Sequence, residues 1–345
     1  RGCLAHRCMN NCPKDAITIG PDHRATIDHT KCINCGMCAK SCPYSAIVKR
    51  TRPCIEACKA KALSSDPVSG RALIDEEKCI SCGQCVYQCP FGAIVDKSFI
   101  TDVIRLIRES ENNKKYHVYA IVAPSIASQY DTLENVTTEQ AVSGIRELGF
   151  HAVLEKGFLT SSCCPGFVDY IHKNYPDIVP EISHNYSPMA QLGKVLKEMD
   201  PGCKTVFIGP CIAKKNELRL VREHVDSVLT FEELQALFNA KDIDIATLEG
   251  TMLDNASYFG RIFARVGGLS EAVAQALKEH NISPEEFTAN PIICNGLAEC
   301  DKALRAHQLG KLENNFIEGM CCPGGCIGVP ACINHSPKDA NEVTK

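Results

Sequence analysis

Apolar residues follow two contrasting patterns along this 345-residue chain. Up to residue 98, short apolar stretches are interrupted by closely spaced cysteines, whereas later apolar runs suited to buried strands alternate with segments of helical periodicity. The predicted strands are 116–123, 204–209 and 290–294. The predicted helices are 139–150, 233–238 and 269–280. Strands that alternate with helices indicate an α/β fold with a mainly parallel, wrapped sheet.

Local signals place several helix starts. Thr230 with Glu233 forms a capping-box pattern, and the pair Gly267-Gly268 opens the last predicted helix. Thr101 is predicted to cap a short helix that carries Val103 and Ile107.

The two patterns predict two domains. Residues 1–98 are expected to form an α+β ferredoxin-like multi-cluster domain. Residues 99–345 are expected to form an α/β catalytic domain with two lobes of wrapped sheet and the active site between them. Sites in such sheets lie where strands end in loops.

The composition narrows the class of protein. The 23 cysteines would suggest a disulfide scaffold in a short secreted chain, but most of them have the spacings of iron–sulfur proteins, which favours a reducing compartment and hence the cytoplasm. The net charge of −4 and the absence of a long Lys/Arg run give no reason to expect nucleic acid or an anionic membrane surface. No apolar run reaches the ~20 residues of a membrane span. Because the chain starts at Arg1, a leader before it stays possible.

Two segments carry the run C-x2-C-x2-C-x3-C-P, beginning at Cys32 and at Cys79. This spacing wraps three thiolates around one 4Fe-4S cube and directs the fourth to a second cube. Structural zinc is the weaker interpretation, since zinc sites use four ligands without this exchange.

The tails after each run resemble one another, which indicates a fourfold repeat with a degenerate third copy and a first copy clipped before Arg1. We call it swapped pairing when the fourth cysteine of one repeat binds the cube of another repeat. Swapped pairing predicts three accessory cubes. Their ligands are Cys32, Cys35 and Cys38 with Cys12; Cys3 and Cys8 with Cys42 and a cysteine lost before Arg1; and Cys79, Cys82 and Cys85 with Cys58. Cys54 and Cys89 are left over as free or structural thiols, unless they complete a different assignment. His6 is interpreted as a surface histidine, with replacement of a thiolate as the alternative.

Three later loops place further cysteines beside Gly or Pro, which lets the backbone approach a bulky inorganic group. The loops are LTSSCCPGF (159–167), FIGPCIAKKNE (207–217) and EGMCCPGGCIGVP (318–330). None has ferredoxin spacing. A site assembled from distant loops is held by the fold itself, which suits a catalytic cluster.

Together these loops resemble those of the FeFe-hydrogenases, tightly in the loops and loosely over residues 116–330. The resemblance implies an H-cluster, in which a 4Fe-4S cube is joined to a di-iron unit that carries carbon monoxide, cyanide and an azadithiolate and is installed by maturation proteins. It also implies reversible reduction of protons to hydrogen in an anaerobic setting. Electrons would pass through about three accessory cubes, to or from ferredoxin or a similar soluble carrier.

The resemblance also assigns roles to the thiols. Cys326 would bridge the cube to the di-iron unit, and Cys163 would hand protons to the azadithiolate amine. The ligands of the cube would be Cys164, Cys211, Cys322 and Cys326.

Five further residues gain roles from the same resemblance. Lys214 would hydrogen-bond one cyanide, and Pro124 and Ser125 would face the other. Met320 would lie near the bridging carbonyl, and Ser183 would relay protons. The alternatives are an exposed lysine at 214 and simple helix caps at Ser125 and Ser183.

The chain departs from the family at several positions. Gly209 stands where well-studied members have Met, Cys321 where they have Ala, and Phe167 where they have Trp. These changes resemble a divergent subgroup. The acidic segment that usually precedes Leu159 is either deleted or disordered, and disorder is the favoured interpretation. Cys321 beside a cube ligand would be a candidate second proton acceptor.

Two other functions stay open. A Nar1-like iron–sulfur assembly protein shares the loops without the di-iron chemistry, and a sensory hydrogenase binds hydrogen and signals. Retention of Cys163, Lys214 and Met320 favours the hydrogenase. The lone cysteines outside cluster spacing are interpreted as buried small hydrophobes; they are Cys203, Cys294, Cys300 and Cys332.

Overall fold

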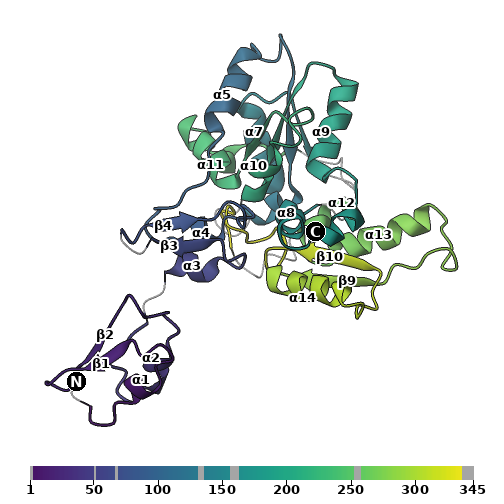
Figure 1. Ribbon diagram of the computed structural model, residues 1–345. Helices are drawn as coiled ribbons and strands as arrows, with labels where there is room; N and C mark the ends of the chain where they lie inside the picture. Colours follow the sequence, from purple (N-terminus) through teal and green to yellow (C-terminus); the bar gives the residue numbers. More distant parts are fainter. Residues whose placement is uncertain are drawn as a thin grey trace. The chain divides into compact units, whose positions relative to one another are not determined.

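The computed structural model describes residues 3–49, 52–66, 69–130, 136–155, 163–251 and 258–335. The chain forms two compact units, Arg1–Glu56 and Ala57–Lys345 (Figure 1). The predicted domain boundary after residue 98 falls within the second unit and stays a prediction. No helix in the described ranges is both long and apolar enough to cross a membrane.

The first unit is built from two short helices and a hairpin. The helices are α1 (Arg7–Asn10) and α2 (Met37–Ser41), and α3 (Pro53–Ala57) begins at its end. The antiparallel hairpin joins β1 (Ile17–Ile19) to β2 (Ala25–Ile27), with Ile17 opposite Ile27. Ala16 and Ile17, at the start of the hairpin, are buried.

The second unit opens with the same pattern. β3 (Leu63–Ser65) pairs antiparallel with β4 (Ala72–Ile74), and α4 (Gln84–Tyr87) follows. In both copies, the amide of the first cysteine of the run donates to a hairpin aspartate carbonyl, Cys32 to Asp28 at 3.0 Å and Cys79 to Asp75 at 2.8 Å.

The fourfold repeat has a common local geometry. At each tail, an alanine amide donates to the sulfur of the cysteine four residues earlier, at 3.2 to 3.4 Å. The cysteines are Cys12, Cys42, Cys58 and Cys89. A sulfur that accepts an amide hydrogen bond is stabilised in its charged form, which prepares it as a metal ligand.

A four-stranded sheet lies at the centre of the second unit. Its order is β6-β5-β7-β8 and all strands are parallel. The strands are β5 (Val118–Val122), β6 (Ala152–Glu155), β7 (Lys204–Ile208) and β8 (Ser227–Leu229). The strands predicted at 116–123 and 204–209 are therefore confirmed. The strands are almost continuously apolar because helices cover them.

Helices surround this sheet, as Figure 1 shows. They are α5 (Ile100–Glu109), α7 (Thr138–Glu147), α9 (Pro188–Met199), α10 (Ile212–Glu217) and α11 (Phe231–Ala240). Helix α8 (Pro165–Asn174) instead belongs to a second core, in which its Phe167 packs with Leu297. The core between helices and sheet includes Ile121, Ile145, Ile208 and Phe238. The predicted capping box of Thr230 and Glu233 is present at α11, and a second one, at Thr137 and Gln140, starts α7.

A smaller parallel pair, β9 (Pro291–Asn295) with β10 (Phe316–Met320), forms the second sheet element. The helices α12 (Tyr258–Arg261), α13 (Gly268–Glu279) and α14 (Leu297–Gln308) belong to this part of the chain. Short 3-10 turns complete the unit at η1 (Pro124–Ser128), η2 (Pro176–Glu181), η3 (Ile245–Thr247) and η4 (Ile262–Ala264). The predicted fold class, a parallel-sheet α/β domain preceded by a ferredoxin-like region, is confirmed.

The predicted cap at Thr101 is wrong. Helix α5 begins at Ile100 with Phe99 as its N-cap, so Thr101 lies inside the first turn. Phe99 is buried, and its amide donates to Glu233 at 3.3 Å. Tertiary packing of Phe99 therefore fixes the helix start, which overrides the local preference of threonine.

Glu318 is a buried carboxylate on β10 that caps a helix from a distance. Its side chain accepts hydrogen bonds from the amides of Gly267 and Ser270, both at 2.8 Å, and from the Ser270 hydroxyl. The negative charge also complements the positive end of α13. This contact ties α13 to the strand that leads to Met320.

We expect Glu318→Ala to lower the free energy of unfolding of the second unit by about 2 to 3 kcal/mol, because two buried amides lose a charged acceptor. Glu318→Gln keeps an acceptor and is expected to cost less. Urea unfolding followed by circular dichroism measures both. Equal stability of the alanine variant and the parent would contradict this role.

Candidate functional site

The three cysteine loops meet at one buried cavity in the second unit, here called the cysteine cavity. It lies at the carboxyl ends of β5, β7 and β10, as expected for a parallel α/β sheet. Its lining includes Pro124, Ser125, Cys163, Cys164, Cys211, Lys214, Phe263, Ala264, Met320, Cys321, Cys322 and Cys326. The structure thus brings together all predicted site residues of the catalytic domain except Ser183.

Two of the predicted cube ligands occupy the same place in their helices. Cys164 is the N-cap of α8 and Cys211 is the N-cap of α10. Pro165 follows Cys164 at the first helical position, where proline fits best. Both thiols therefore lie at helix N-termini, which favour the thiolate form.

The loop after β10 places the other two, Cys322 and Cys326. The Cys326 amide donates to the Ala264 carbonyl at 2.6 Å. Gly325 has φ +84°, and an added Cβ there would lie 2.5 Å from that same carbonyl. Only glycine permits this close approach, so Gly325 is a geometric requirement.

The thiols of the cavity differ in acidity. Burial, followed by the nearby thiolates of Cys326 and Cys164, raises the pKa of Cys211 to about 12. Burial also raises the pKa of Cys322 well above its usual value, and the neighbouring thiols add to it. A side-chain hydrogen bond from Cys321 lowers the pKa of Cys164 to about 6. Such a set of buried thiols is stable in its ionised form only beside positive charge, as iron would provide.

Cys321 is the donor in that contact. Its own pKa is raised well above the usual range by the hydrogen bond to Cys164 and by burial. Cys321 therefore stays protonated beside a predicted cube ligand. Its suggested role as a second proton acceptor stays a prediction.

Lys214 is buried rather than exposed, which excludes the surface-lysine alternative. Its ammonium lies 2.6 Å from the Glu217 carboxylate. Burial lowers the pKa of Lys214, but Glu217 and the thiols of Cys211 and Cys163 outweigh it, so the net shift is upward. The cavity therefore contains a permanent cation.

Ser125 is fully buried, and its hydroxyl has no hydrogen-bond partner among the described residues. A buried hydroxyl without a partner costs free energy, so this one is suited to a polar ligand in the cavity. Four thiols, an ammonium and an orphaned hydroxyl fit a cube together with a further polar inorganic group.

Gln129 fixes the turn that carries Ser125. Its side-chain amide donates to the Ser125 carbonyl at 3.0 Å, and its side-chain oxygen accepts from the Ile333 amide at 2.8 Å. The Cys332 thiol lies 3.9 Å from the Cys326 carbonyl. These contacts join η1 to the segment that follows Cys326.

Ser183 lies elsewhere. It lines a separate cavity with Phe167, Glu181 and His307, and its hydroxyl accepts from Asn185 at 3.1 Å. His307 lies 2.7 Å from the Glu181 carboxylate. The relay role of Ser183 stays a prediction. The position just before Leu159, where the acidic segment was expected, lies outside the described residues, which leave out 156–162.

The departure at Gly209 has a packing reason. An added Cβ would lie 2.7 Å from the Phe207 ring and 3.0 Å from the Ala123 side chain. Phe207 thus occupies the space that a larger side chain at 209 would need. At Gly319, an added Cβ would lie 2.4 Å from the Phe167 ring.

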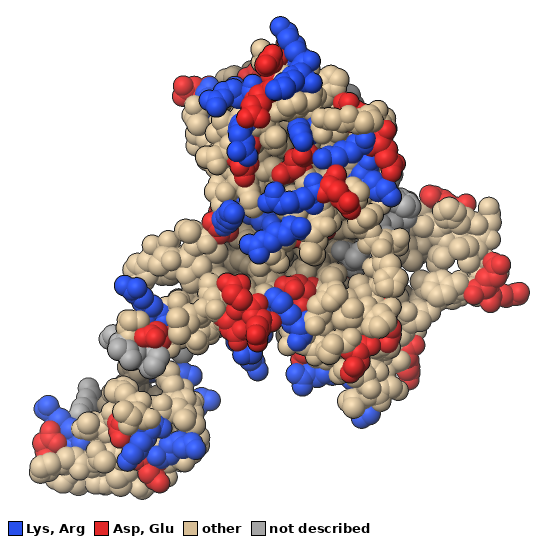
Figure 2. Space-filling model, turned by 45° about the horizontal axis from the view of Figure 1, so that its top comes forward, with Lys and Arg blue, Asp and Glu red and all other residues tan. Residues whose placement is uncertain are grey.

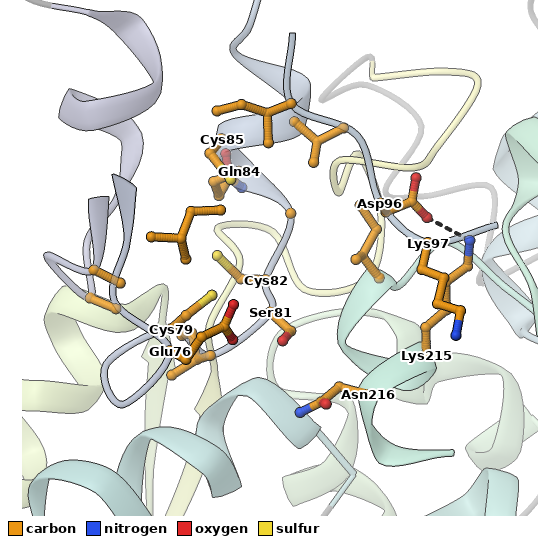
Figure 3. Close-up of a pocket in the computed structure, with 18 of the residues that line it drawn as sticks. Glu76, Cys79, Ser81, Cys82, Gln84, Cys85, Asp96, Lys97, Lys215 and Asn216 are labelled. Carbon is orange, nitrogen blue, oxygen red and sulfur yellow. Dashed lines mark hydrogen bonds and ion pairs between the residues drawn. The ribbon is translucent and has the colours of Figure 1, made fainter. Parts of the chain in front are cut away.

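A second cavity, of about 310 Å³, is here called the accessory cavity (Figure 3). It is lined by the four thiols of one predicted cube, namely Cys58, Cys79, Cys82 and Cys85. Burial raises the pKa of Cys82 to about 11, with Cys85, Cys58 and Cys79 as further causes. The swapped pairing of Cys58 with the later run is therefore present in the geometry.

Residues 79–85, here called the accessory loop, pack against α8 and α10, the helices that follow Cys164 and Cys211. An added Cβ at Gly83 would lie 2.4 Å from Ile212, the residue after Cys211. The Lys173 ammonium on α8 donates to the Cys79 carbonyl at 2.6 Å. In addition, the thiolate of Cys82 contributes to the raised pKa of Cys322, after the larger effects of burial and nearer thiols. The two thiol sets are therefore neighbours.

Lys215, on α10, holds the chain segment that follows the last cysteine repeat. It contacts the carboxylates of Asp96, drawn as a dashed line in Figure 3, and of Glu233 at 2.8 Å. This buried cation joins the chain after the last repeat to α10 and α11.

The remaining cysteines follow the predictions in part. Cys203, Cys294, Cys300 and Cys332 are buried, as expected. Cys54 is also buried, while Cys89 is partly exposed. Cys38 has its pKa raised by burial, with Cys32 and Cys35 as neighbouring charges. No disulfide forms among the cysteines of the described ranges. Within those ranges no group of three or more His, Cys, Asp or Glu side chains is arranged to hold a single metal ion.

Sequence patterns missed several residues of the site. Glu217 and Gln129 act through contacts that are buried or distant in sequence, and Phe263 and Ala264 reach the cavity from a segment without cysteines. For Glu217 a signal was available, since it lies three residues after Lys214 on a helix.

Residues 154–330 match the family of the iron only hydrogenase large subunit, C-terminal domain, over just over half of the chain. This chain belongs to the iron-only hydrogenase family. Residues 1–46 match a 4Fe-4S dicluster domain and residues 72–95 a 4Fe-4S binding domain.

Relatives of this hydrogenase-family chain fall into two groups. Iron hydrogenase 1 of Clostridium pasteurianum is 26% identical over an alignment 388 residues long. The alignment covers 92% of this chain and 66% of that protein. The cytosolic Fe-S cluster assembly factor NAR1 of Kluyveromyces lactis is 37% identical over 91 residues, 26% of this chain and 19% of that protein. A variant of the [FeFe]-hydrogenase HydA1 from Chlamydomonas reinhardtii shares the fold, with a TM-score of 0.54, 21% identity, and coverage of 72% of this chain and 88% of that one.

Cys58 and Cys89 offer a matched test of the accessory cavity in this family member. Both sulfurs accept an alanine amide, at 3.2 and 3.3 Å, but only Cys58 is among the residues that line the accessory cavity. We expect Cys58→Ser to lose about four iron per chain, since one cube loses a thiolate. Cys89→Ser is expected to keep the parent's iron content. Iron analysis of both anaerobically purified variants measures this, and equal losses would contradict the assignment.

Proposed function

We propose that this chain catalyses the reversible reduction of protons to hydrogen at an H-cluster in the cysteine cavity. The observation that carries the proposal is the surplus of polar groups there. A cube needs four ligands, supplied by Cys164, Cys211, Cys322 and Cys326. The cavity also holds the Cys163 thiol, the Lys214 ammonium and the orphaned Ser125 hydroxyl.

These additional groups suit a second inorganic unit beside the cube. Cys326 would bridge the two, while Lys214 and Ser125 would hold its anionic ligands from two sides, with Pro124 and Met320 as the surrounding wall. The unit, with its carbon monoxide, cyanide and azadithiolate, would supply the redox-active metal at which hydrogen forms or is split. Maturation proteins would install it.

Cys163 would move the proton. It lies buried in the cavity next to the predicted cube ligand Cys164, and Lys214 is close enough for the two to influence each other's charge. A thiol held there can donate a proton to a base on the ligand and recover it from solvent. Ser183 and the groups near it would continue the proton route.

Electrons would arrive through the accessory cubes. The contact of the accessory loop with α8 and α10 supports this route, because a cube on that loop would lie next to the cysteine cavity. The dicluster module would extend this path to ferredoxin or a similar soluble carrier.

We place the protein in the cytoplasm, because thiols of this kind persist in a reducing compartment. Figure 2 shows acidic and basic side chains interspersed on one face.

The alternative is an iron–sulfur assembly function like that in the name of NAR1. The relation to Iron hydrogenase 1 extends over 92% of this chain, whereas the relation to NAR1 extends over 26% for the Kluyveromyces lactis protein and 48% for the Arabidopsis thaliana protein. The length of the match and the surplus polar groups favour hydrogen chemistry.

We expect Cys163→Ala to lower hydrogen evolution from reduced viologen by roughly 10²- to 10⁴-fold, because proton transfer loses its donor. Iron content should stay at the parent value, since Cys163 is not among the assigned cube ligands. Cys203→Ala is the control, a buried thiol that precedes β7 at the opposite end of that strand from Cys211. Undiminished activity in Cys163→Ala would remove this residue from the mechanism.

A further inference from the structure

Exposed cations line the accessory cavity in addition to its four thiols. Lys97, Arg219 and Arg222 are among the lining residues, and all three are exposed. Lys97 lies just before α5, whereas the two arginines follow α10. Two separate segments therefore bring positive charge to one opening, and we call these three residues the basic rim.

The charge of the basic rim is not neutralised locally. Arg219 and Arg222 form no ion pair with any residue in the described ranges. Lys215, the other cation of the lining, is instead buried and neutralised by two carboxylates. Glu76 is an exposed carboxylate of the lining, so the three cations of the rim outnumber it at the surface. A positive rim on a chain with a net charge of −4 favours a negatively charged partner.

Apolar side chains lie exposed at the same opening. Ile74 is 43% exposed and Val95 is 77% exposed, and both line the cavity. Leu220, which lies between the two arginines in sequence, is 84% exposed. Exposed apolar residues bordered by charged ones are typical of a surface that binds another protein.

The thiols beneath this surface indicate what the partner does. Cys58, Cys79, Cys82 and Cys85 line the same cavity, so a cube bound by them would lie at the opening. Electron tunnelling slows steeply with distance, and a carrier therefore has to dock close to the cluster with which it exchanges electrons. The basic rim lies where such a carrier would have to bind.

The degenerate third repeat also points to this opening. A second cube built around Cys89 would need three further thiols, but the third repeat retains only Cys54 and Cys58. Cys58 lines the accessory cavity, and Cys89 is not among its lining residues. Under the predicted assignment, repeats three and four supply a single cube, which leaves no outer cluster in these repeats to receive electrons first.

We propose that the basic rim, together with Ile74 and Val95, is the docking surface of an acidic electron-carrier protein that exchanges electrons directly with the cube in the accessory cavity. One electron passes from the reduced carrier to the oxidised cube in each encounter, and no proton is transferred. This entry does not require the clusters of the first unit. Electron flow towards the cysteine cavity is taken from the proposed function, on which this docking rests, but reduction of the cube is measurable without hydrogen chemistry.

The test uses the full chain with its cubes intact and, as the probe, reduced flavodoxin, an acidic one-electron carrier. Stopped-flow absorbance under anaerobic conditions follows the flavodoxin semiquinone that forms as the cubes are reduced. We expect Arg219→Glu combined with Arg222→Glu to lower the second-order rate constant about 10-fold or more at low salt, because repulsion replaces attraction. Added salt should slow the parent and narrow the difference.

Lys278→Glu combined with Lys302→Glu is the matched control. It changes the net charge by the same amount, at exposed positions on α13 and α14 that do not line the accessory cavity. Its rate constant with flavodoxin should stay close to that of the parent. Methyl viologen, a small cationic reductant, should reduce the rim variant at least as fast as the parent, since it needs no protein docking surface. Iron content should be the same in all three proteins.

Three results would contradict docking at the basic rim. Equal rate constants for the rim variant and the control with flavodoxin would show that electrons enter elsewhere, for example through the first unit. Equal slowing with flavodoxin and with methyl viologen would show that the arginines act on the cube itself. A dimer of the parent that the rim variant loses, seen by light scattering, would show that a second copy of this chain covers the surface. Because none of these readouts involves hydrogen, failure of the proposed function alone would leave them unchanged.

Discussion

Buried thiolates need a positive charge beside them, and the thiol-lined cavities of this chain depend on that requirement. In the cysteine cavity, burial and mutual repulsion raise the pKa of Cys211 and Cys322, so the thiolates are unstable there without a cation. Iron would supply that charge and hold together the loops that carry the thiols. The left-handed turns, helix N-termini and Gly325 all serve to bring sulfur atoms together at fixed points.

The parallel sheet converts this requirement into a site that more than one element supports. Strands β5, β7 and β10, which belong to two sheets, end at the same cavity. The segments that follow these strands supply Ser125, Cys211 and the loop with Cys322 and Cys326. The accessory loop packs against the helices α8 and α10. Under the proposed function, electron delivery and catalysis would share the same packing.

Sequence predicted what is local or repeated. The spacing of Cys79, Cys82 and Cys85 predicted thiols that do line one cavity, and the capping box at Thr230 was found because its partners lie three residues apart. Family resemblance supplied the cysteine cavity, whose residues lie on distant loops. Long-range contacts escaped prediction, as at Gln129 and Glu318, because no periodicity marks them. The cap at Thr101 failed since packing of the neighbouring Phe99 sets the helix start.

The central claim is that the cysteine cavity holds a di-iron unit beside its cube. An anaerobic infrared spectrum of protein matured with its assembly factors, or loaded with a synthetic di-iron complex, tests it most directly. The account predicts sharp bands from metal-bound carbon monoxide and cyanide. A spectrum without these bands, from protein whose cubes are intact, would contradict it and favour an assembly function.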